Sequence, residues 1–283
     1  LNLLIANFCD INITKIGYKQ IEPYLKYSLP LLPVALISFF NDAIIRLLLK
    51  DHLSYAMLGV YTATISIAAL TSLIKSGFTI YWTPFMYSNY KTENELIKRI
   101  HSMLTFFIIS FSFIIILSSD VLFLLLDPQY RIGKPVFAFL LISPVVYTIS
   151  ETTCYGIYLS KKTHLQFYSI LTSFVFCMFF GFILIPEYGL LGAAIANAIG
   201  GLIFFILRTY FGLKEYNSVE KIKRTFLSVF VLVLTSIIYY LITDVIIRNS
   251  IIVLLFSIII YMYIDIIRKF TSMLRENFIS GSN

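Results

Sequence analysis

The sequence predicts an all-α membrane protein, a polytopic bundle of about eight transmembrane helices. The first observation is composition: of 283 residues, 59% are hydrophobic and 13% are charged, and the mean hydropathy is +0.86. Soluble domains carry about 25% charged residues. The second is the length of the apolar segments, because roughly 20 apolar residues cross the hydrocarbon core of a bilayer. The third is the uneven distribution of basic residues between alternate loops.

Eight apolar segments of suitable length follow one another along the chain. They are Ser28–Leu49, Tyr55–Pro84, His101–Leu124, Pro135–Leu159, His164–Ile185, Leu190–Gly212, Thr225–Ile247 and Ser250–Arg268. Backbone polar groups at membrane depth must be paired within their own segment, which favours helices. A strand of a membrane β-barrel would alternate polar and apolar residues, and Ile251–Tyr261 does not.

The basic residues indicate which ends of the helices face the cytoplasm. Of the 22 Lys and Arg residues, fifteen fall before the first segment, after the last one, or in the loops that follow the second, fourth and sixth segments. Five fall on the opposite side, and Lys75 and Arg208 lie within segments. Cytoplasmic loops carry such an excess, so both ends of the chain are predicted to be cytoplasmic. We attribute the net charge of +7 to topology and contact with anionic lipids, not to nucleic acid.

The chain is predicted to have four parts. Residues 1–26 are expected to be the end of a preceding span, Leu1–Phe8, and a cytoplasmic linker. Residues 27–213 would form a six-helix half-bundle, residues 214–268 an amphipathic linker with two additional spans, and residues 269–283 a cytoplasmic tail.

The connections between segments differ in length and composition. Short outer loops are expected at Lys50–Ser54, Pro186–Gly189 and Arg248–Asn249, and a short interfacial helix followed by a turn is expected within Ser118–Lys134. On the inner side, two stretches mix charged residues with periodic apolar ones and are predicted to be surface helices. These stretches are Asn89–Ile100 and Leu213–Arg224.

Small and helix-bending residues suggest how the segments pack. Gly192, Ala196 and Gly200 recur every four residues on one face of the sixth segment, a spacing that lets two helices approach closely. Ordinary kinking explains any single proline or glycine in the first, second and fourth segments, but together they suggest helices that bend around a cavity. These residues are Pro30, Pro33, Gly59, Gly77, Pro84, Pro144 and Gly156.

Four ionisable residues within the segments are candidates for a substrate-binding cavity. A charged side chain near the bilayer centre costs about 2.5–3.5 kcal/mol on insertion scales, so it usually faces a partner or water. Lys75 and Glu151 lie well inside the second and fourth segments, where they either pair or separately line a cavity. Asp42 and Arg46 lie one turn apart in the first segment and have the spacing of an ion pair. A purely structural pair, with Arg46 reaching toward the outer interface, is the alternative.

The sequence contains no motif typical of an enzyme or a nucleotide-driven pump. Nucleophile-elbow, zinc-protease and phosphate-loop motifs are absent. His52, His101 and His164 lie at different segment boundaries, which predicts interfacial residues and no metal site or cofactor. Cys9, Cys154 and Cys177 are interpreted as small buried hydrophobic residues. Tyr81 and Trp82 are expected at the inner headgroup level.

A series of short motifs resembles a transporter family. Ile185–Ala196 (IPEYGLLGAAIA) is similar to a turn between two late helices of polysaccharide exporters in the multidrug/oligosaccharidyl-lipid/polysaccharide flippase superfamily. Supporting stretches follow in the expected order: Leu29–Pro33, Asn41-Asp42, Leu58–Tyr61, Trp82–Phe85 and Leu126–Tyr130. The chain departs from the pattern at Ala43, where many relatives carry a basic residue directly after the acid.

This resemblance implies a Wzx-type flippase of the bacterial inner membrane. The eight segments would be the second half of a MATE-like bundle plus two extra helices, and the first half would be a missing partner. The implied substrate is an O-antigen or capsular repeat unit on undecaprenyl pyrophosphate, moved by alternating access. Further implied partners are bilayer lipids, a polysaccharide polymerase and a chain-length regulator.

The resemblance also suggests roles for the four candidate residues. Lys75 and Arg46 would attract the pyrophosphate or an acidic sugar, while Asp42 and Glu151 would organise these cations or carry a coupling proton. Another lipid-linked precursor or a multidrug compound is the alternative substrate. A membrane polymerase is a less favoured alternative, because the longest outer loop holds only Arg131 and Lys134 as basic residues.

Overall fold

The computed structural model describes residue 22, residues 28–29 and residues 31–268, except for the side chains of Leu31 and Asp42. This part of the chain is helical and contains no strand. It confirms the predicted all-α class. The expected preceding span and most of the linker in residues 1–26, the tail in residues 269–283, Cys9 and Pro30 lie outside the described residues.

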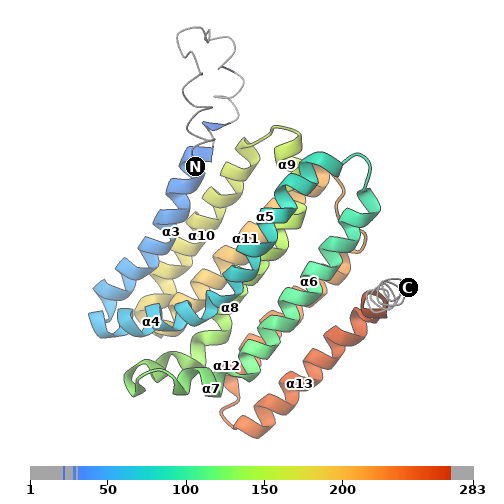
Figure 1. The fold of residues 1–283 in the computed structure, drawn as a ribbon. Helices are drawn as coiled ribbons and strands as arrows, with labels where there is room; N and C mark the ends of the chain where they lie inside the picture. The colour runs from blue at the N-terminus through green and yellow to red at the C-terminus, as the bar shows by residue number, and fades with distance from the viewer. Residues whose placement is uncertain (1–21, 23–27, 30, 269–283) are drawn as a thin grey trace, which may run out of the picture.

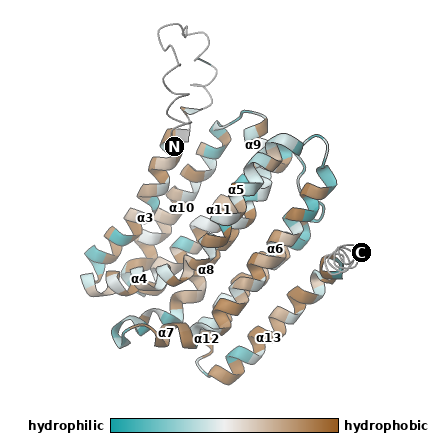
Figure 2. Cartoon of the chain, in the orientation of Figure 1, coloured by the Kyte–Doolittle hydropathy of each residue, from teal (hydrophilic) through white to brown (hydrophobic). Residues whose placement is uncertain are grey.

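Seven segments among the described residues are long and apolar enough to cross a membrane, which is consistent with a multi-pass membrane protein. The eighth candidate is a pair of helices that meet at a bend. Figure 2 shows hydrophobic residues along most of the long helices and hydrophilic residues toward their ends. The seven are α3 (Leu31–His52), α6 (Asn94–Leu117), α8 (Phe137–Thr153) with the 3₁₀ helix η2 (Pro128–Val136) before it, α10 (His164–Tyr188), α11 (Leu190–Glu215), α12 (Ile222–Leu241) and α13 (Val245–Met262).

The predicted second segment is a bent pair rather than one continuous helix. Its two parts, α4 (Tyr55–Ala68) and α5 (Leu70–Asn89), meet at Ala69 with an angle of 43°. The hydroxyl of Thr71 donates to the Ala68 carbonyl at 2.7 Å and so pairs one backbone group at the break. The break lies at Ala69 and not at Gly59, Gly77 or Pro84, the residues predicted to bend this segment.

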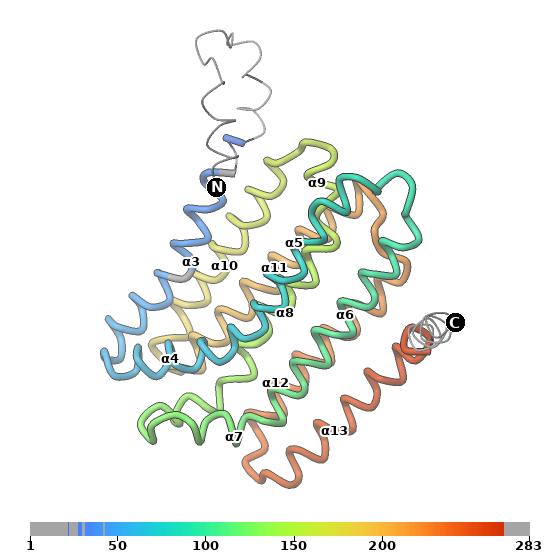
Figure 3. The backbone as a smooth tube through the Cα atoms, viewed as in Figure 1, coloured from blue at the N-terminus to red at the C-terminus, as the bar shows by residue number. Residues whose placement is uncertain are grey.

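The helices form a bundle in which the chain passes repeatedly between two ends (Figures 1 and 3). On one side α3 packs against α10, and α10 packs along α11. In the middle α11 packs against α8, and on the other side α6, α12 and α13 pack together and against the centre through α8. The start of α3 and the end of α13 lie at the same end of the bundle as the α5–α6 loop, the α11–α12 loop and the loop between the short helix α9 (Tyr155–Leu159) and α10.

Two predicted surface helices are instead continuous with membrane-spanning helices. The stretch Asn89–Ile100 supplies the last residue of α5 and the first two turns of α6. The stretch Leu213–Arg224 is divided between the end of α11 and the start of α12. Helices of 24 and 26 residues are about 36–39 Å long and exceed the ~30 Å hydrocarbon core. Their charged ends therefore extend beyond it without a separate helix.

The opposite end of the bundle also differs from the predicted boundaries. A short helix, α7 (Ser119–Leu124), is present as expected, but η2 follows it where a turn was expected. The turn before α13 lies at residues 242–244, so the loop predicted at Arg248–Asn249 is wrong. Asp244 begins α13 there, because its carboxylate accepts the backbone N–H groups of Ile246 and Ile247 at 2.9 Å.

Two further helix ends depart from the sequence prediction. The fourth segment breaks at Cys154 into α8 and the short α9 (Tyr155–Leu159). Helix α10 continues through Pro186 to Tyr188, so the predicted four-residue loop shrinks to Gly189 alone. Gly189 has φ +56°, a backbone conformation that residues with a side chain rarely adopt, and this allows the sharp turn into α11.

Small residues set the distance between α11 and its neighbours. A Cβ atom on Gly192 would collide with the Leu184 carbonyl of α10, and one on Gly200 would lie 2.9 Å from Cys177 Cβ. Ala196 lies between these glycines and is fully buried. On the other side of α11, Gly212 approaches the backbone of Thr153 closely, a contact not predicted from sequence. These contacts hold α8, α10 and α11 together around the candidate site.

Candidate functional site

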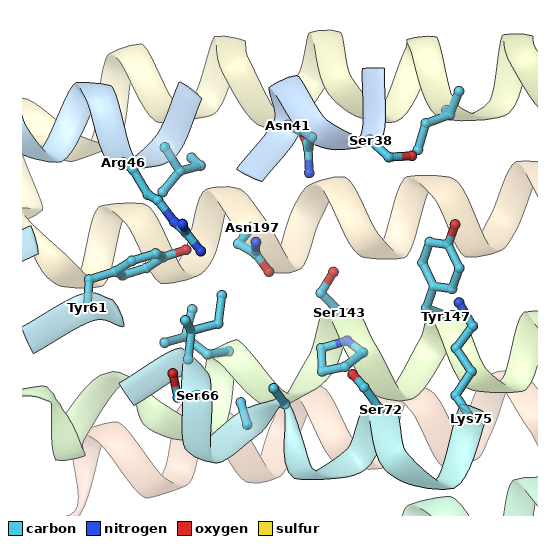
Figure 4. A pocket seen from close by; sticks show the side chains of 17 residues that line it. Ser38, Asn41, Arg46, Tyr61, Ser66, Ser72, Lys75, Ser143, Tyr147 and Asn197 are labelled. Carbon is cyan, nitrogen blue, oxygen red and sulfur yellow. The ribbon is translucent and has the colours of Figure 1, made fainter. Parts of the chain in front are cut away.

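A polar cavity of about 460 Å³ lies beside the bend between α4 and α5. Side chains from α3, α4, α5, α8, α10 and α11 form its wall. Most of its polar groups are neutral hydroxyls and amides, and two are cations. The labelled side chains in Figure 4 are Ser38, Asn41, Arg46, Tyr61, Ser66, Ser72, Lys75, Ser143, Tyr147 and Asn197.

The two cations lie at opposite ends of this cavity. Figure 4 shows Arg46 beside Tyr61 at one end and Lys75 beside Tyr147 at the other, with Asn197 between them. Asn41 also lines the cavity, and its side-chain oxygen is buried without a hydrogen-bond partner. An unpaired buried amide oxygen is costly in an apolar bundle, so this position favours water or a ligand hydroxyl.

Lys75 belongs to a group of three charged residues that we call the central cluster: Lys75, Glu151 and Arg208. Glu151 Oε1 lies 3.4 Å from Lys75 Nζ and 3.1 Å from Arg208 Nη1. The Lys75 side chain is 31% exposed, whereas those of Glu151 and Arg208 are 11% and 4% exposed. The carboxylate is therefore enclosed between two cations, and only one of these cations reaches the cavity.

Neutral groups fix the orientation of Arg208. Its guanidinium donates to Ser150 Oγ at 2.8 Å and, through Nε, to Gln166 Oε1 at 3.2 Å. The aromatic ring of Tyr147 lies near both cations, with Lys75 Nζ 3.9 Å and Arg208 Cζ 5.4 Å from its centroid. Cations bind favourably to the face of an aromatic ring. Arg208 thus has several fixed partners, while Lys75 has two and remains partly exposed.

Ion pairing gives the central cluster little net stability. Three ionised groups at membrane depth cost about 8–10 kcal/mol on insertion scales. Two pairs of opposite charges about 4 Å apart contribute roughly 8 kcal/mol at an effective dielectric constant of 20, and repulsion between the two cations reduces this contribution. Because the net attraction does not exceed the cost of insertion, a stabilising role does not explain the cluster. One acid and two bases also leave a net positive charge beside the cavity.

The structure brings together some of the residues singled out from the sequence and separates others. Lys75 and Glu151 form a pair, which resolves the two alternatives left open for them. Arg46 lines the same cavity but lies at its far end. The side chain of Asp42 lies outside the described residues, and so does the expected pair between Asp42 and Arg46. Gly192, Ala196 and Gly200 lie in helix contacts and do not line the cavity.

Sequence analysis missed Arg208 as a candidate residue. It lies in the sixth predicted segment, where an ionised side chain near one end has the simpler explanation of reaching the interface. In the structure it is 3% exposed and contacts a carboxylate on another helix. Its position within an apolar segment was the available signal, but the pairing depends on the crossing of α8 and α11 at Gly212.

Other predicted interfacial residues are buried instead. His101 is 1% exposed, and its ring nitrogens lie 2.6 Å and 2.9 Å from the hydroxyls of Thr152 and Thr225. Trp82 is also buried, and its indole N–H donates to the Glu151 carbonyl at 3.2 Å, whereas Tyr81 is exposed. Helices from several parts of the chain therefore cover His101 and Trp82, and their depth at the membrane interface stays a prediction. Within the described residues, no group of His, Cys, Asp or Glu is arranged to hold a metal ion.

A second group of charged residues, which we call the rim cluster, lies where α7, η2 and α13 meet. Asp120 pairs with Lys134 and, at 3.0 Å, with Arg248. Arg248 lies over the ring of Tyr239, whose hydroxyl donates to Ser119 Oγ at 2.8 Å. Partial burial alone would raise the pKa of Asp120, but the hydrogen bond and charge of Lys134, together with Arg248, outweigh it and lower that pKa.

Comparison with known proteins gives no assignment. No family model, no curated protein and no solved structure matches the chain.

Proposed function

We propose that this protein moves the polar head group of a lipid-linked saccharide across a bacterial inner membrane. The substrate would be an O-antigen or capsular repeat unit carried on undecaprenyl pyrophosphate. The observation that supports this proposal most strongly is a polar cavity, next to a net positive cluster, inside an apolar helical bundle. A sugar pyrophosphate cannot cross hydrocarbon unaided, because its polar groups would lose water without gaining partners.

The chemistry of the cavity wall suits both parts of such a head group. Hydroxyl and amide side chains, including Ser72, Ser143 and Asn197, offer hydrogen bonds to sugar hydroxyls. Lys75 offers a positive charge to a phosphate oxygen. When Lys75 turns toward the ligand, Arg208 remains on Glu151, so the buried carboxylate is not left unpaired. The central cluster therefore supports an exchange of one anionic partner of Lys75 for another.

The volume of the cavity limits how much of the substrate it would hold at once. Ligand pockets of about 300–1,000 Å³ enclose small molecules of drug size, and the cavity measures about 460 Å³. It would therefore hold a pyrophosphate with one or two sugars, and the remaining sugars would extend out of it. Motion that opens the cavity alternately to each side would complete the transfer.

A translocation assay with defined substrates tests this function. The protein would be placed in vesicles with a fluorescent undecaprenyl-pyrophosphate disaccharide, and chemical quenching from outside would report transfer between leaflets. We expect faster transfer than in protein-free vesicles. A lipid-linked substrate without phosphate and a cationic drug serve as the comparison substrates. Transfer of the drug but not of the saccharide would favour the multidrug alternative and contradict the proposal.

A further inference from the structure

A second hollow, of about 390 Å³, lies on the outside of the bundle between α3 and α4. We call it the α3–α4 groove. Its wall is mostly apolar and carries two cations. The lining residues are Phe39, Ala43, Arg46, Leu47, Lys50 and Leu58. Phe39 and Leu47 are 69% and 51% exposed, so no described part of the protein covers this surface.

The groove and the polar cavity meet at one side chain. Arg46 lines both hollows, and Figure 4 shows it entering the cavity from α3 beside Tyr61. A ligand at Arg46 is therefore in contact with the polar cavity on one side and an exposed, mostly apolar surface on the other. This combination matches a molecule with a polar head and a long hydrocarbon chain.

The charges at this junction favour a phosphate group. Arg46 and Lys50 lie one helical turn apart, on the same face of α3. Among the described side chains, which do not include that of Asp42, neither forms an ion pair, and the ammonium group of Lys50 lies 5.4 Å from the centroid of the Tyr55 ring. Two such cations are complementary to one phosphate anion.

The length of the groove fits one leaflet of the bilayer. From Phe39 to Lys50, α3 advances about 16 Å along its axis, given a rise of 1.5 Å per residue. One leaflet of the hydrocarbon core is about 15 Å thick. A chain lying along this part of α3 would therefore reach from the cations near the helix end to about the middle of the membrane.

We propose that the α3–α4 groove holds the chain of a polyprenyl phosphate lipid, with the phosphate nearest the chain at Arg46 and Lys50. The second phosphate and the saccharide would then extend through the neighbouring cavity toward Lys75, while the chain remains in lipid. This inference rests on the proposed function, and it specifies where the lipid part of the substrate binds.

Tryptophan quenching in vesicles tests the groove directly. Leu47→Trp places a reporter in the groove, and Leu254→Trp places a matched reporter on α13, where Leu254 is 62% exposed. Both variants keep Trp82, which is 2% exposed and gives the same background. In brominated phosphatidylcholine, both reporters are quenched by the lipid chains. Unbrominated undecaprenyl phosphate is then added in increasing mole fraction.

We expect undecaprenyl phosphate to restore the fluorescence of Leu47→Trp and to leave Leu254→Trp quenched. Unbrominated phosphatidic acid, which carries the same phosphate on two acyl chains, should need at least a fivefold higher mole fraction. Adding Arg46→Gln and Lys50→Gln to Leu47→Trp should shift the midpoint for undecaprenyl phosphate at least tenfold.

Three results would overturn the groove proposal: no recovery at Leu47→Trp, equal recovery at Leu254→Trp, or equal potency of phosphatidic acid. The last result would identify a general site for anionic phospholipid. The translocation assay stays separate from this test. Transfer that depends on Lys75 without binding in the groove would overturn the groove and leave the proposed function standing.

Discussion

The central cluster and the rim cluster have the same composition, one carboxylate between two cations, but different surroundings. Glu151 is enclosed among helices and borders a cavity through Lys75, whereas Asp120 lies at an end of the bundle, with its side chain 31% exposed. The rim cluster connects α7, η2 and α13 and borders neither of the two hollows described above. A charge triad acquires a role from what it faces, and of these two clusters the central one borders a described hollow.

The largest expected effect is on stability, in Arg208→Gln. Removing one partner of a buried ion pair costs about 3–5 kcal/mol when the remaining charge is left unpaired. Glu151 keeps Lys75 at 3.4 Å, so the loss should fall below this range. Arg248→Gln is the matched change in the rim cluster, where Asp120 keeps Lys134 and reaches water. We expect a clearly larger loss of unfolding free energy for Arg208→Gln, measured by denaturant titration in detergent micelles. An equal or larger loss in Arg248→Gln would contradict the difference drawn between the clusters.

The next effect is on transport, in Lys75→Ala. A hydrogen bond to a charged group contributes about 1.5–3 kcal/mol, so losing it should slow saccharide translocation by roughly tenfold or more. In cells, surface polysaccharide should fall without a fall in protein level. Lys134→Ala, which removes the corresponding lysine from the rim cluster, should leave translocation within about twofold of wild type. Unchanged surface polysaccharide in Lys75→Ala would indicate a packing role only.

A smaller effect is expected for Asp120→Asn. This change removes the charge that Lys134 and Arg248 share but keeps the side-chain volume. A partly exposed ion pair such as Asp120–Lys134 contributes little, about 0–1 kcal/mol. Arg248, which is 7% exposed, keeps its contacts with the Tyr239 ring and Asn249. Thermal unfolding in detergent should therefore show a modest decrease in melting temperature, with translocation retained. Loss of translocation at normal protein level would place the rim cluster in the transport mechanism and contradict the difference drawn between the two clusters.

The smallest expected effect is a pH dependence of the stability that the ion pairs of Asp120 contribute. The pKa of Asp120 is lowered in the folded protein, so its stabilisation is present above the ordinary carboxyl pKa of about 3.9. This stabilisation is lost as the pH falls through the lower pKa that Asp120 has in the folded protein. The difference in melting temperature between wild type and Asp120→Asn should therefore shrink as the pH is lowered below about 4. A difference that grows in acid would mean that the sign of this pKa shift is wrong.

Apolar segment length was enough to predict the helices, because each helix at membrane depth must pair its own backbone. It also indicated Lys75 and Glu151 as expensive charges that need partners. The helix ends were less predictable. Polar residues such as Asn94 and Glu215 continue a helix out of the hydrocarbon, so composition changes before the helix ends.

The cavity depends on tertiary contacts that no single segment encodes. The bend at Ala69 lies between residues of ordinary helix propensity and lines the cavity with Ser66 and Ser72. Arg208 reaches Glu151 because Gly212 lets α11 approach the backbone of α8. The cavity and the Arg208–Glu151 pair depend on which helices meet and on the distance between them. The sequence pattern of a single helix predicts neither.

Water access to the cavity is the most direct test of the central claim, that its polar wall faces an aqueous space for an anionic head group. Ser72 lines the cavity, so Ser72→Cys places a thiol in the cavity wall. The adjacent Leu73 is an exposed apolar residue, so Leu73→Cys is the matched control. Cys154 and Cys177 are fully buried, and Cys9 would be replaced by serine. A membrane-impermeant thiol reagent should label Ser72→Cys but not Leu73→Cys, and lipid-linked saccharide should slow that labelling. Equal labelling at both positions, or no labelling of Ser72→Cys from either side of the membrane, would contradict the claim that the cavity is an aqueous space.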